Sequence, residues 1–373
     1  MSRPLRVGVV GCGGIAQMMH LPTLAERPDL FQIAALADLS DKTLAAVGDR
    51  YGVAARFKDG RELAARPDVE AVLLFSSGCH REAVLDLLGA RKPIFVEKPL
   101  AFSLAETEEV ARAVREAGVP FMVGYHKRFD PAYLRARRAV REMRDLRFLE
   151  VTVLHPDDDA YRTHHAVLPV PEKPWRPRPE AEGSAIIVAR VTGGAFTGCV
   201  DRIVGPQAPL HHRVGAYILF DSLIHDVDAV RGILGDPEAV VSSHVWRAGF
   251  AQTSLSRFPG DVRASLSWIS VPGLKHYEET LRFVADDTRV KLVFPSPYIR
   301  HAPTPLTIER MEGEELVVEH HTVSYEEAFR AELHHFRDAL LSGRPPAPSL
   351  EDALGDARWI QQIASAYADG ASR

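Results

Sequence analysis

The sequence predicts an α/β fold in two parts. The first part is a doubly wound parallel sheet, and the second is an α+β part with a large, mostly antiparallel open sheet. Three observations lead to this prediction: strand-like and helical segments alternate over the first third of the chain, strand-like segments then follow one another, and a glycine cluster follows the first strand. Alternation is typical of parallel sheets, whereas consecutive strands are typical of antiparallel ones.

The first part is expected to form one domain over residues 1–125. Short apolar runs bounded by polar residues and glycines are the pattern of buried strands, and helices between them make right-handed crossovers. The clearest helices are predicted at 80–90 and 103–117. The strands are predicted at 5–10, 32–37, 70–75, 93–97 and 119–124.

The second part is expected to form a domain over residues 126–373. A helix at about 131–144 opens it, and one helix at about 217–234 interrupts its strands. Two amphipathic helices, within 325–368, are expected to pack near the domain junction; the first ends at Gly343, before prolines that stop a helix. Examples of the predicted strands are 149–154, 185–191, 239–246, 262–269, 279–284 and 316–319.

The segment 155–183 is irregular and rich in proline. A loop of this length in a compact domain is often functional. The sequence leaves three interpretations open, which are a lid over a site, a contact between subunits and a plain surface excursion.

The composition is that of an ordinary globular protein. The 373 residues are 46% hydrophobic and 25% charged, and the length allows two domains with separate cores. A net charge of −5 argues against a nucleic-acid partner. Three cysteines without motif spacing indicate a reduced, cytoplasmic setting. We find no signal peptide and no apolar run long enough to span a membrane, so no membrane partner is expected.

The glycine cluster lies in Val7-Gly8-Val9-Val10-Gly11-Cys12-Gly13-Gly14-Ile15-Ala16. Gly11 allows a tight turn, Gly13 allows the backbone to approach a phosphate, and the small Ala16 lets the helix pack close to the strand. This pattern after a strand predicts a Rossmann-type dinucleotide site. Asp38, at the end of the second strand, can accept hydrogen bonds from ribose hydroxyls and would repel a 2′-phosphate. NAD is therefore favoured over NADP, although Lys42 keeps NADP possible.

Two further places carry candidate catalytic groups. Lys98 follows a buried strand, where ligands of open parallel sheets bind, and its cation can stabilise a developing alkoxide. Asp221 and His225 are four residues apart on a predicted helix, so they share a face, and an imidazole beside a carboxylate can act as general acid or base. Asp228 is a second possible partner of His225. The chain has sixteen histidines, but adjacent pairs rarely chelate one ion, and no metal is expected.

Taken together, these motifs resemble the Gfo/Idh/MocA family of NAD(P)-dependent oxidoreductases. Beside the glycine loop, the resemblance rests on ALAD at the second strand, VEKPLA, GYHKRFDP, the DSLIHDVD helix and the closing SYEEAFRAELHHFRDALLSGRPP. The family's T-P-[NS]-x-x-H motif is altered here to Phe75-Ser76-Ser77-Gly78-Cys79-His80.

The resemblance implies roles for individual residues. It implies catalytic roles for Lys98, Asp221 and His225, with the histidine as general base. It implies cofactor binding by Gly11, Gly13, Gly14, Ile15, Asp38, Ser76, Ser77, His80, Glu97 and Lys98. It implies substrate binding by Lys98, His126, Arg128, His155, Asp221 and His225.

The expected function is transfer of hydride between NAD and a secondary alcohol or ketone carbon of a sugar, sugar derivative or cyclitol. A second possibility is an enzyme that retains NAD and uses it transiently, as a sugar–sugar oxidoreductase or in oxidation of a glycoside at C3. A non-catalytic NAD or sugar sensor ranks last, because Lys98, Asp221 and His225 are all present. The resemblance also implies a homodimer or homotetramer.

Overall fold

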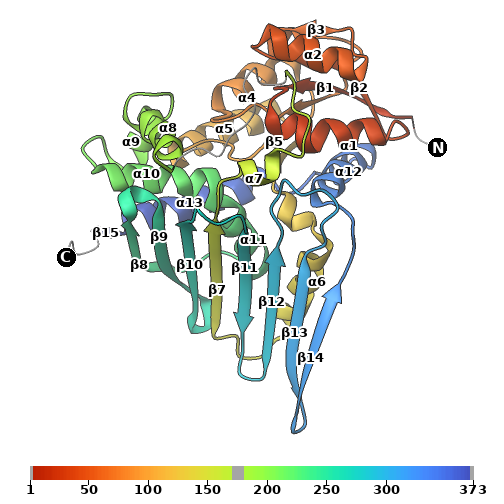
Figure 1. Ribbon diagram of the computed structural model, residues 1–373. Helices are drawn as coiled ribbons and strands as arrows, with labels where there is room; N and C mark the ends of the chain where they lie inside the picture. Colours follow the sequence, from red (N-terminus) through yellow and green to blue (C-terminus); the bar gives the residue numbers. More distant parts are fainter. Residues whose placement is uncertain (1–2, 170–179, 370–373) are drawn as a thin grey trace.

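The structure is a computed structural model that describes residues 3–169 and 180–369 (Figure 1). Two sheets organise it, one parallel and six-stranded, the other mixed and nine-stranded. This architecture confirms the predicted fold class. Of the proline-rich segment, the prolines at 171, 174, 177 and 179 lie outside the described residues.

The parallel sheet has the strand order β3-β2-β1-β4-β5-β6. All of its described pairings are parallel, and its central strands are buried on both faces. Its strands are β1 (Leu5–Val10), β2 (Phe31–Ala37), β3 (Arg56–Phe57), β4 (Ala71–Leu74), β5 (Ile94–Glu97) and β6 (Phe121–Gly124). Its helices are α1 (Leu21–Glu26), α2 (Asp41–Tyr51), α3 (Gly60–Ala64), α4 (Arg81–Leu87) and α5 (Leu104–Ala117).

The second sheet has the order β14-β13-β12-β11-β7-β10-β9-β8-β15. Two of its pairings are parallel, β7 with β10 and β8 with β15, and the others are antiparallel. Its strands are β7 (Phe148–His155), β8 (Ala239–Trp246), β9 (Ala251–Phe258), β10 (Val262–Ser270), β11 (Glu278–Val284), β12 (Thr288–Phe294), β13 (Pro305–Glu312), β14 (Glu315–Thr322) and β15 (Tyr367–Asp369).

Helices cover one face of this sheet, with α6 against β12 and α13 against β8 (Figure 1). The remaining helices are α6 (Pro131–Glu142), α7 (Asp159–Arg162), α8 (Glu180–Thr192), α9 (Thr197–Val204), α10 (Leu210–Ile218), α11 (Ile224–Leu234), α12 (Ala328–Leu341) and α13 (Leu350–Ser365). Over the described ranges, no helix has the length and apolar character needed to cross a bilayer.

One predicted strand is wrong. Residues 185–191 lie within helix α8, and α9 and α10 follow it, so more than one helix interrupts the strands of this part. The apolar residues of this run occur at helical spacing: Ile187 and Val191 pack into the core, while Ile186 is exposed. The β-branched composition suggested a strand, but packing on one helical face decides the conformation.

Helix α12 returns from the end of the chain to the first sheet. Its Leu333 and Phe336 are fully buried in the same apolar cluster as Val7, Val9 and Phe95. The core of the parallel sheet is therefore completed by residues more than 200 positions further along the chain.

Candidate active site

The strand order of the parallel sheet reverses between β1 and β4, which are neighbours with crossovers in opposite directions. Ligands of doubly wound sheets bind at such a switch point, outside the carboxyl ends of the strands. The loops after β1 and β4 meet here. Gly11 has a φ of +88°, and a Cβ on it would lie 2.4 Å from the backbone nitrogen of Ser76. Only glycine fits this position.

A cleft of about 670 Å³ opens at the switch point. Gly11, Gly13, Asp38, Ser76 and Ser77 are among the residues that line it. Gly13 is exposed, and a Cβ on it would meet no atom within 4 Å, so the backbone of this loop faces open space. This arrangement fits the pyrophosphate of a dinucleotide, which needs close approach to backbone N–H groups.

The carboxylate of Asp38 is held in place by the backbone. Its Oδ2 accepts a hydrogen bond from the Cys12 nitrogen at 2.8 Å, and its Oδ1 accepts one from the Ser40 nitrogen at 2.8 Å. The two cations nearest in the cleft wall are already paired: Lys58 with Asp41, and Arg61 with Asp59. The described cleft therefore presents a fixed negative charge at the end of β2.

Five predicted cofactor residues do not line the cleft, namely Gly14, Ile15, His80, Glu97 and Lys98, and two of them are held by buried contacts instead. Both ring nitrogens of the buried His80 are engaged, Nδ1 with the Pro99 oxygen at 2.7 Å and Nε2 with the Ser76 oxygen at 2.6 Å. Glu97 is buried and pairs with Nε2 of His20 at 2.6 Å. His80 thus holds the loop after β4 against the Lys98–Pro99 turn and fixes the position of one relative to the other.

Two further predicted cofactor residues, Gly14 and Ile15, follow Gly13 directly in the chain. Gly14 is exposed, and its nearest neighbour is the end of the Met18 side chain. Ile15 packs against the small apolar cluster of Met18, Met19 and Phe329.

The structure brings Lys98 to the helix that carries Asp221 and His225. Lys98 Nζ donates a hydrogen bond to the backbone oxygen of Asp221 at 2.6 Å. Asp221 lies in a π-helical turn, Leu219–Leu223, that joins α10 to α11, and its side chain is exposed. The sequence predicted that Lys98 acts together with Asp221 and His225, although Lys98 and Asp221 are 123 positions apart in the chain.

His225 is neutral at physiological pH in this environment. Burial lowers the pKa of its imidazole well below the usual 6.5, and the positive charge of Lys98 and the nearby His126 lower it further. Its Nδ1 is buried without a hydrogen-bond partner among the described residues. A neutral imidazole with a vacant nitrogen, beside a lysine ammonium, can accept a proton from a hydroxyl group.

Asp221 is connected to a chain of polar groups. Its Oδ1 accepts from the Tyr217 hydroxyl at 3.2 Å, and Arg190 Nη1 donates to that hydroxyl at 3.0 Å. Within the described ranges, no hydrogen bond joins Asp221 to His225. The sequence missed Tyr217 and Arg190, although Tyr217 precedes Asp221 by four positions, one helical turn.

A second cavity, of about 320 Å³, lies beside Asp221. His155 lines it together with Asp158, Arg162 and Trp268. Charged and hydroxyl-bearing side chains form part of the described wall and apolar ones the rest, as suits a sugar ring with its hydroxyl groups. His155 is therefore placed near Asp221, as the sequence predicted for two substrate residues.

His126 lies against His225, with ring centroids 4.9 Å apart, and stacks on Phe329 at 4.2 Å. Burial lowers the pKa of His126 well below its usual value, so this ring is also neutral. The neighbouring Lys127 is buried and forms ion pairs with Glu279 and, at 3.4 Å, with Asp226. No sequence pattern predicted the pair of Lys127 with Glu279, because it joins segments more than 150 residues apart.

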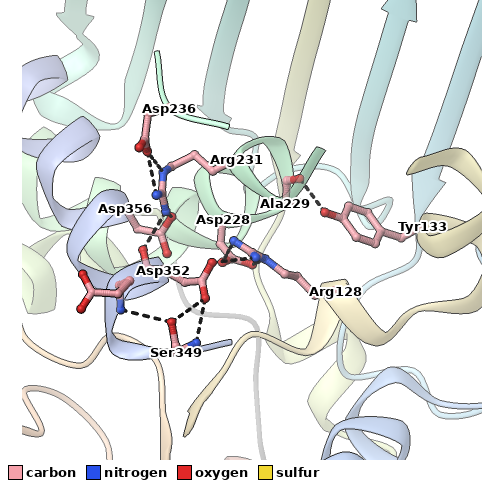
Figure 2. A network of polar contacts seen from close by, with 10 residues as sticks. Arg128, Tyr133, Asp228, Ala229, Arg231, Asp236, Ser349, Asp352 and Asp356 are labelled. Atoms are coloured by element: carbon pink, nitrogen blue, oxygen red, sulfur yellow. Dashed lines mark hydrogen bonds and ion pairs between the residues drawn. The ribbon is translucent and has the colours of Figure 1, made fainter. Parts of the chain in front are cut away.

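Arg128 is the centre of a network of ion pairs (Figure 2). Its Nε and Nη2 bind the buried Asp228 at 2.9 and 2.6 Å, and its Nη1 binds Asp352 at 2.9 Å. Asp352 in turn caps α13 by accepting from the Ser349 nitrogen at 2.8 Å. Arg128 thus links three segments of the second part, which corrects its predicted role in substrate binding. Asp228 pairs with Arg128, so the alternative that Asp228 is a partner of His225 is wrong as well.

The described end of the proline-rich segment crosses to the glycine loop. In Figure 1 this yellow-green segment runs from α7 toward the parallel sheet, in the upper half of the view. The buried Gln17 donates to the Leu168 oxygen and accepts from the Leu168 nitrogen, both at 2.7 Å, and also donates to the Cys12 oxygen at 2.8 Å. Arg50 donates to the Ala166 oxygen at 2.7 Å. We call residues 163–169 the strap.

Known proteins resemble this chain in sequence and in fold. Residues 5–125 match the family model described as "Oxidoreductase family, NAD-binding Rossmann fold". The myo-inositol 2-dehydrogenase of Thermotoga maritima is 25% identical over 359 residues, covering 93% of this chain and 92% of the relative. Residues 5–125 thus match the NAD-binding part of the Gfo/Idh/MocA oxidoreductases, and the similarity to the Thermotoga maritima protein extends over most of the chain.

Other relatives match over shorter stretches. The oxidoreductase YrbE of Bacillus subtilis is 30% identical over 160 residues, which is 42% of this chain and less than half, 46%, of that protein. The inositol 2-dehydrogenase of Acidothermus cellulolyticus is 36% identical over 144 residues, 38% of this chain and 41% of the relative.

Two solved structures share the fold over nearly the whole chain. The 3-ketoreductase KijD10 of Actinomadura kijaniata, in complex with NADP and TDP-benzene, has a TM-score of 0.72 at 22% identity and covers 98% of this chain and 99% of its own. The aldose-aldose oxidoreductase of Caulobacter crescentus has a TM-score of 0.73 at 21% identity, with 97% and 98% covered.

Proposed function

We propose that this protein transfers hydride between NAD and a secondary alcohol or ketone carbon of a sugar, sugar derivative or cyclitol. The observation that carries the proposal is the contact of Lys98 with the Asp221 backbone beside a neutral His225, at the carboxyl edge of the parallel sheet. The names of the relatives support the substrate class: inositol 2-dehydrogenases and a 1,5-anhydro-D-fructose reductase are among them.

The residues present fit a bound dinucleotide, because Gly13 borders open space and Asp38 stands fixed at the end of β2. When bound, the nicotinamide supplies the acceptor or donor of hydride. His225 takes the hydroxyl proton in the oxidation direction and returns it in the reduction direction. The Lys98 ammonium donates a hydrogen bond to the same oxygen and stabilises its developing negative charge, and Asp221 orients Lys98 and a neighbouring hydroxyl.

The direct test is a screen of turnover. Purified protein is mixed with NAD or NADP and a panel of sugars, sugar acids, glycosides and inositols, and reduced cofactor is followed by absorbance. We expect turnover with at least one polyhydroxylated substrate. If such a substrate is found and Lys98→Ala and His225→Ala both keep the wild-type kcat, the proposed roles are wrong.

We further propose that NAD is preferred over NADP. The Asn side chain of an Asp38→Asn variant would still accept from the Cys12 nitrogen but would not repel a 2′-phosphate. We expect the ratio of kcat/KM for NAD to that for NADP to fall about tenfold or more, which corresponds to about 1.4 kcal/mol. Asp49→Asn, on the far turn of α2, is the matched control and leaves the ratio unchanged. A wild-type preference for NADP would contradict this proposal.

The strap favours a second candidate, an enzyme that keeps NAD bound through the catalytic cycle. Gln17 ties Leu168 to the carbonyl of Cys12 in the glycine loop, so the loop and the strap are held together. Opening of the cofactor site then requires two strap hydrogen bonds to break, each worth about 0.5–1.5 kcal/mol.

A Gln17→Met variant tests the strap. The substitution keeps the length of the side chain and removes its hydrogen bonds to Leu168, so we expect faster NAD dissociation, by about five- to a hundredfold. Stopped-flow displacement of bound NADH measures the rate. Gln361→Met, which removes a side-chain hydrogen bond to Ile203 elsewhere, is the control. Equal dissociation rates for wild type and Gln17→Met would exclude a retaining role for the strap.

A further inference from the structure

Two cysteines and a carboxylate from three separate elements meet behind the loop that lines the cofactor cleft. Cys79 lies between β4 and α4, Glu106 in the first turn of α5, and Cys199 on α9. One donor atom of each lies within 4.8 Å of the other two. Cys199 Sγ is 3.5 Å from Glu106 Oε1, and Cys79 Sγ is 4.0 Å from Oε2.

The cluster is mostly shielded from solvent but has one open side. Glu106 and Cys199 are only 6% and 9% exposed, whereas Cys79 is half-buried. Arg202 approaches Glu106 Oε1 at 3.8 Å, and 55% of its side chain is exposed. Cys79 is thus the least shielded of the three residues.

Both thiols must lose their protons when a cation binds their sulfurs, so metal affinity at this site rises with pH.

We propose that Cys79, Glu106 and Cys199 bind a thiophilic divalent cation, with Zn²⁺ as the best match. Thiolates select zinc over magnesium or calcium. With Zn–S of about 2.3 Å and Zn–O of about 2.1 Å, the ligand atoms of a tetrahedral site lie about 3.5–3.8 Å apart, close to the two sulfur–oxygen distances here. Three protein ligands leave a fourth position for water on the open side of Cys79.

The charges of the site balance. Two thiolates and one carboxylate bring three negative charges, the cation brings two positive charges, and Arg202 brings the third. Binding releases the thiol protons to solvent and needs no oxidant. Without a cation, the same groups must stay protonated in part, because like charges at these distances repel in a buried site.

The ion would join α9 to the loop that carries Ser76 and Ser77. Phe196, just before α9, already packs on this loop, since a Cβ on Gly78 would lie 3.1 Å from its ring. A cation bound to Cys79 and Cys199 therefore fixes the wall of the cofactor cleft against the second part of the molecule. This role is independent of hydride transfer, so its failure leaves the proposed function untouched.

Cobalt titration of the reduced full-length protein tests the site. We expect one Co²⁺ per chain, with sulfur-to-cobalt charge-transfer absorption and the strong d–d bands of a tetrahedral site, and displacement of Co²⁺ by Zn²⁺. Cys79→Ser, Cys199→Ser and Glu106→Gln should lower bound metal at least tenfold. Glu109→Gln, on the next turn of α5, is the matched control and keeps full binding.

Wild-type protein alone also decides the question, even if a variant fails to fold. Zinc should slow alkylation of Cys79 by iodoacetamide at least tenfold under native conditions. Absence of thiolate–cobalt bands, or bands that persist in both cysteine variants, overturns the proposal. Formation of a Cys79–Cys199 disulfide with hydrogen peroxide, in protein that binds no cobalt, also overturns it and assigns the pair to thiol oxidation instead.

Discussion

Replacement of His225 by Gln is expected to lower kcat by about 10² to 10⁴, the usual contribution of a positioned general base. Glutamine keeps a polar side chain of similar reach but cannot accept and return a proton at neutral pH. KM should change much less, because the lost interaction belongs to the transition state. Steady-state kinetics with the substrate identified in the screen give both constants.

His244→Gln is the matched control, since it makes the same substitution at an exposed histidine of β8. Its kcat should equal that of the wild type. A His225→Gln variant that retains more than about a tenth of the wild-type kcat would remove this residue from the proton transfer.

The pH dependence of the wild type provides an independent check on the same histidine. His225 acts as a base only when neutral, so oxidation is lost as the pH falls through its pKa. Burial and the charge of Lys98 lower that pKa well below the usual 6.5. The acid limb of kcat/KM for oxidation should therefore lie below pH 6.5, and a limb at or above that value would contradict the lowered pKa of His225.

The second large effect is expected on stability. Arg128→Met removes the cation that pairs with Asp228, whose side chain is 1% exposed (Figure 2). A buried carboxylate without its partner costs about 3–5 kcal/mol. The midpoint of urea unfolding should fall accordingly, with the slope of the transition nearly unchanged.

Asp236→Asn is the control for this network. Asp236 pairs with Arg231 at 2.7 Å, but 63% of its side chain is exposed, so its loss should cost less than about 1 kcal/mol. An Arg128→Met variant of normal stability with a strongly raised KM would reverse the assignment and return Arg128 to the substrate site.

The strands of the parallel sheet could be predicted from the sequence, whereas the strand expected at 185–191 could not, and both outcomes have a physical reason. Strands buried on both faces are continuous apolar runs, such as β4 and β5, and they are easy to recognise. The strand at 185–191 failed because Ile and Val only bias a segment toward a strand, and here the packing of Ile187 and Val191 on one face of a helix decides the conformation.

At the candidate site, the spacing of residues predicted features that lie within one short segment of the chain. It did not predict ion pairs between distant segments. The Gly11 turn and the Lys98 strand end follow from a strand and its first loop. The ion pair of Lys127 with Glu279, and the two carboxylates around Arg128, depend on how distant segments pack, which no spacing encodes.

The position of α12 has a consequence for synthesis of the chain. Leu333 and Phe336 fill the core of the first sheet, so the N-terminal part leaves the ribosome about 200 residues before its packing is complete. At about 5–20 residues per second, this interval lasts roughly 10–40 s, during which Val9 and Phe95 lack their final neighbours. The part of the protein that is translated first is therefore among the last to complete its core.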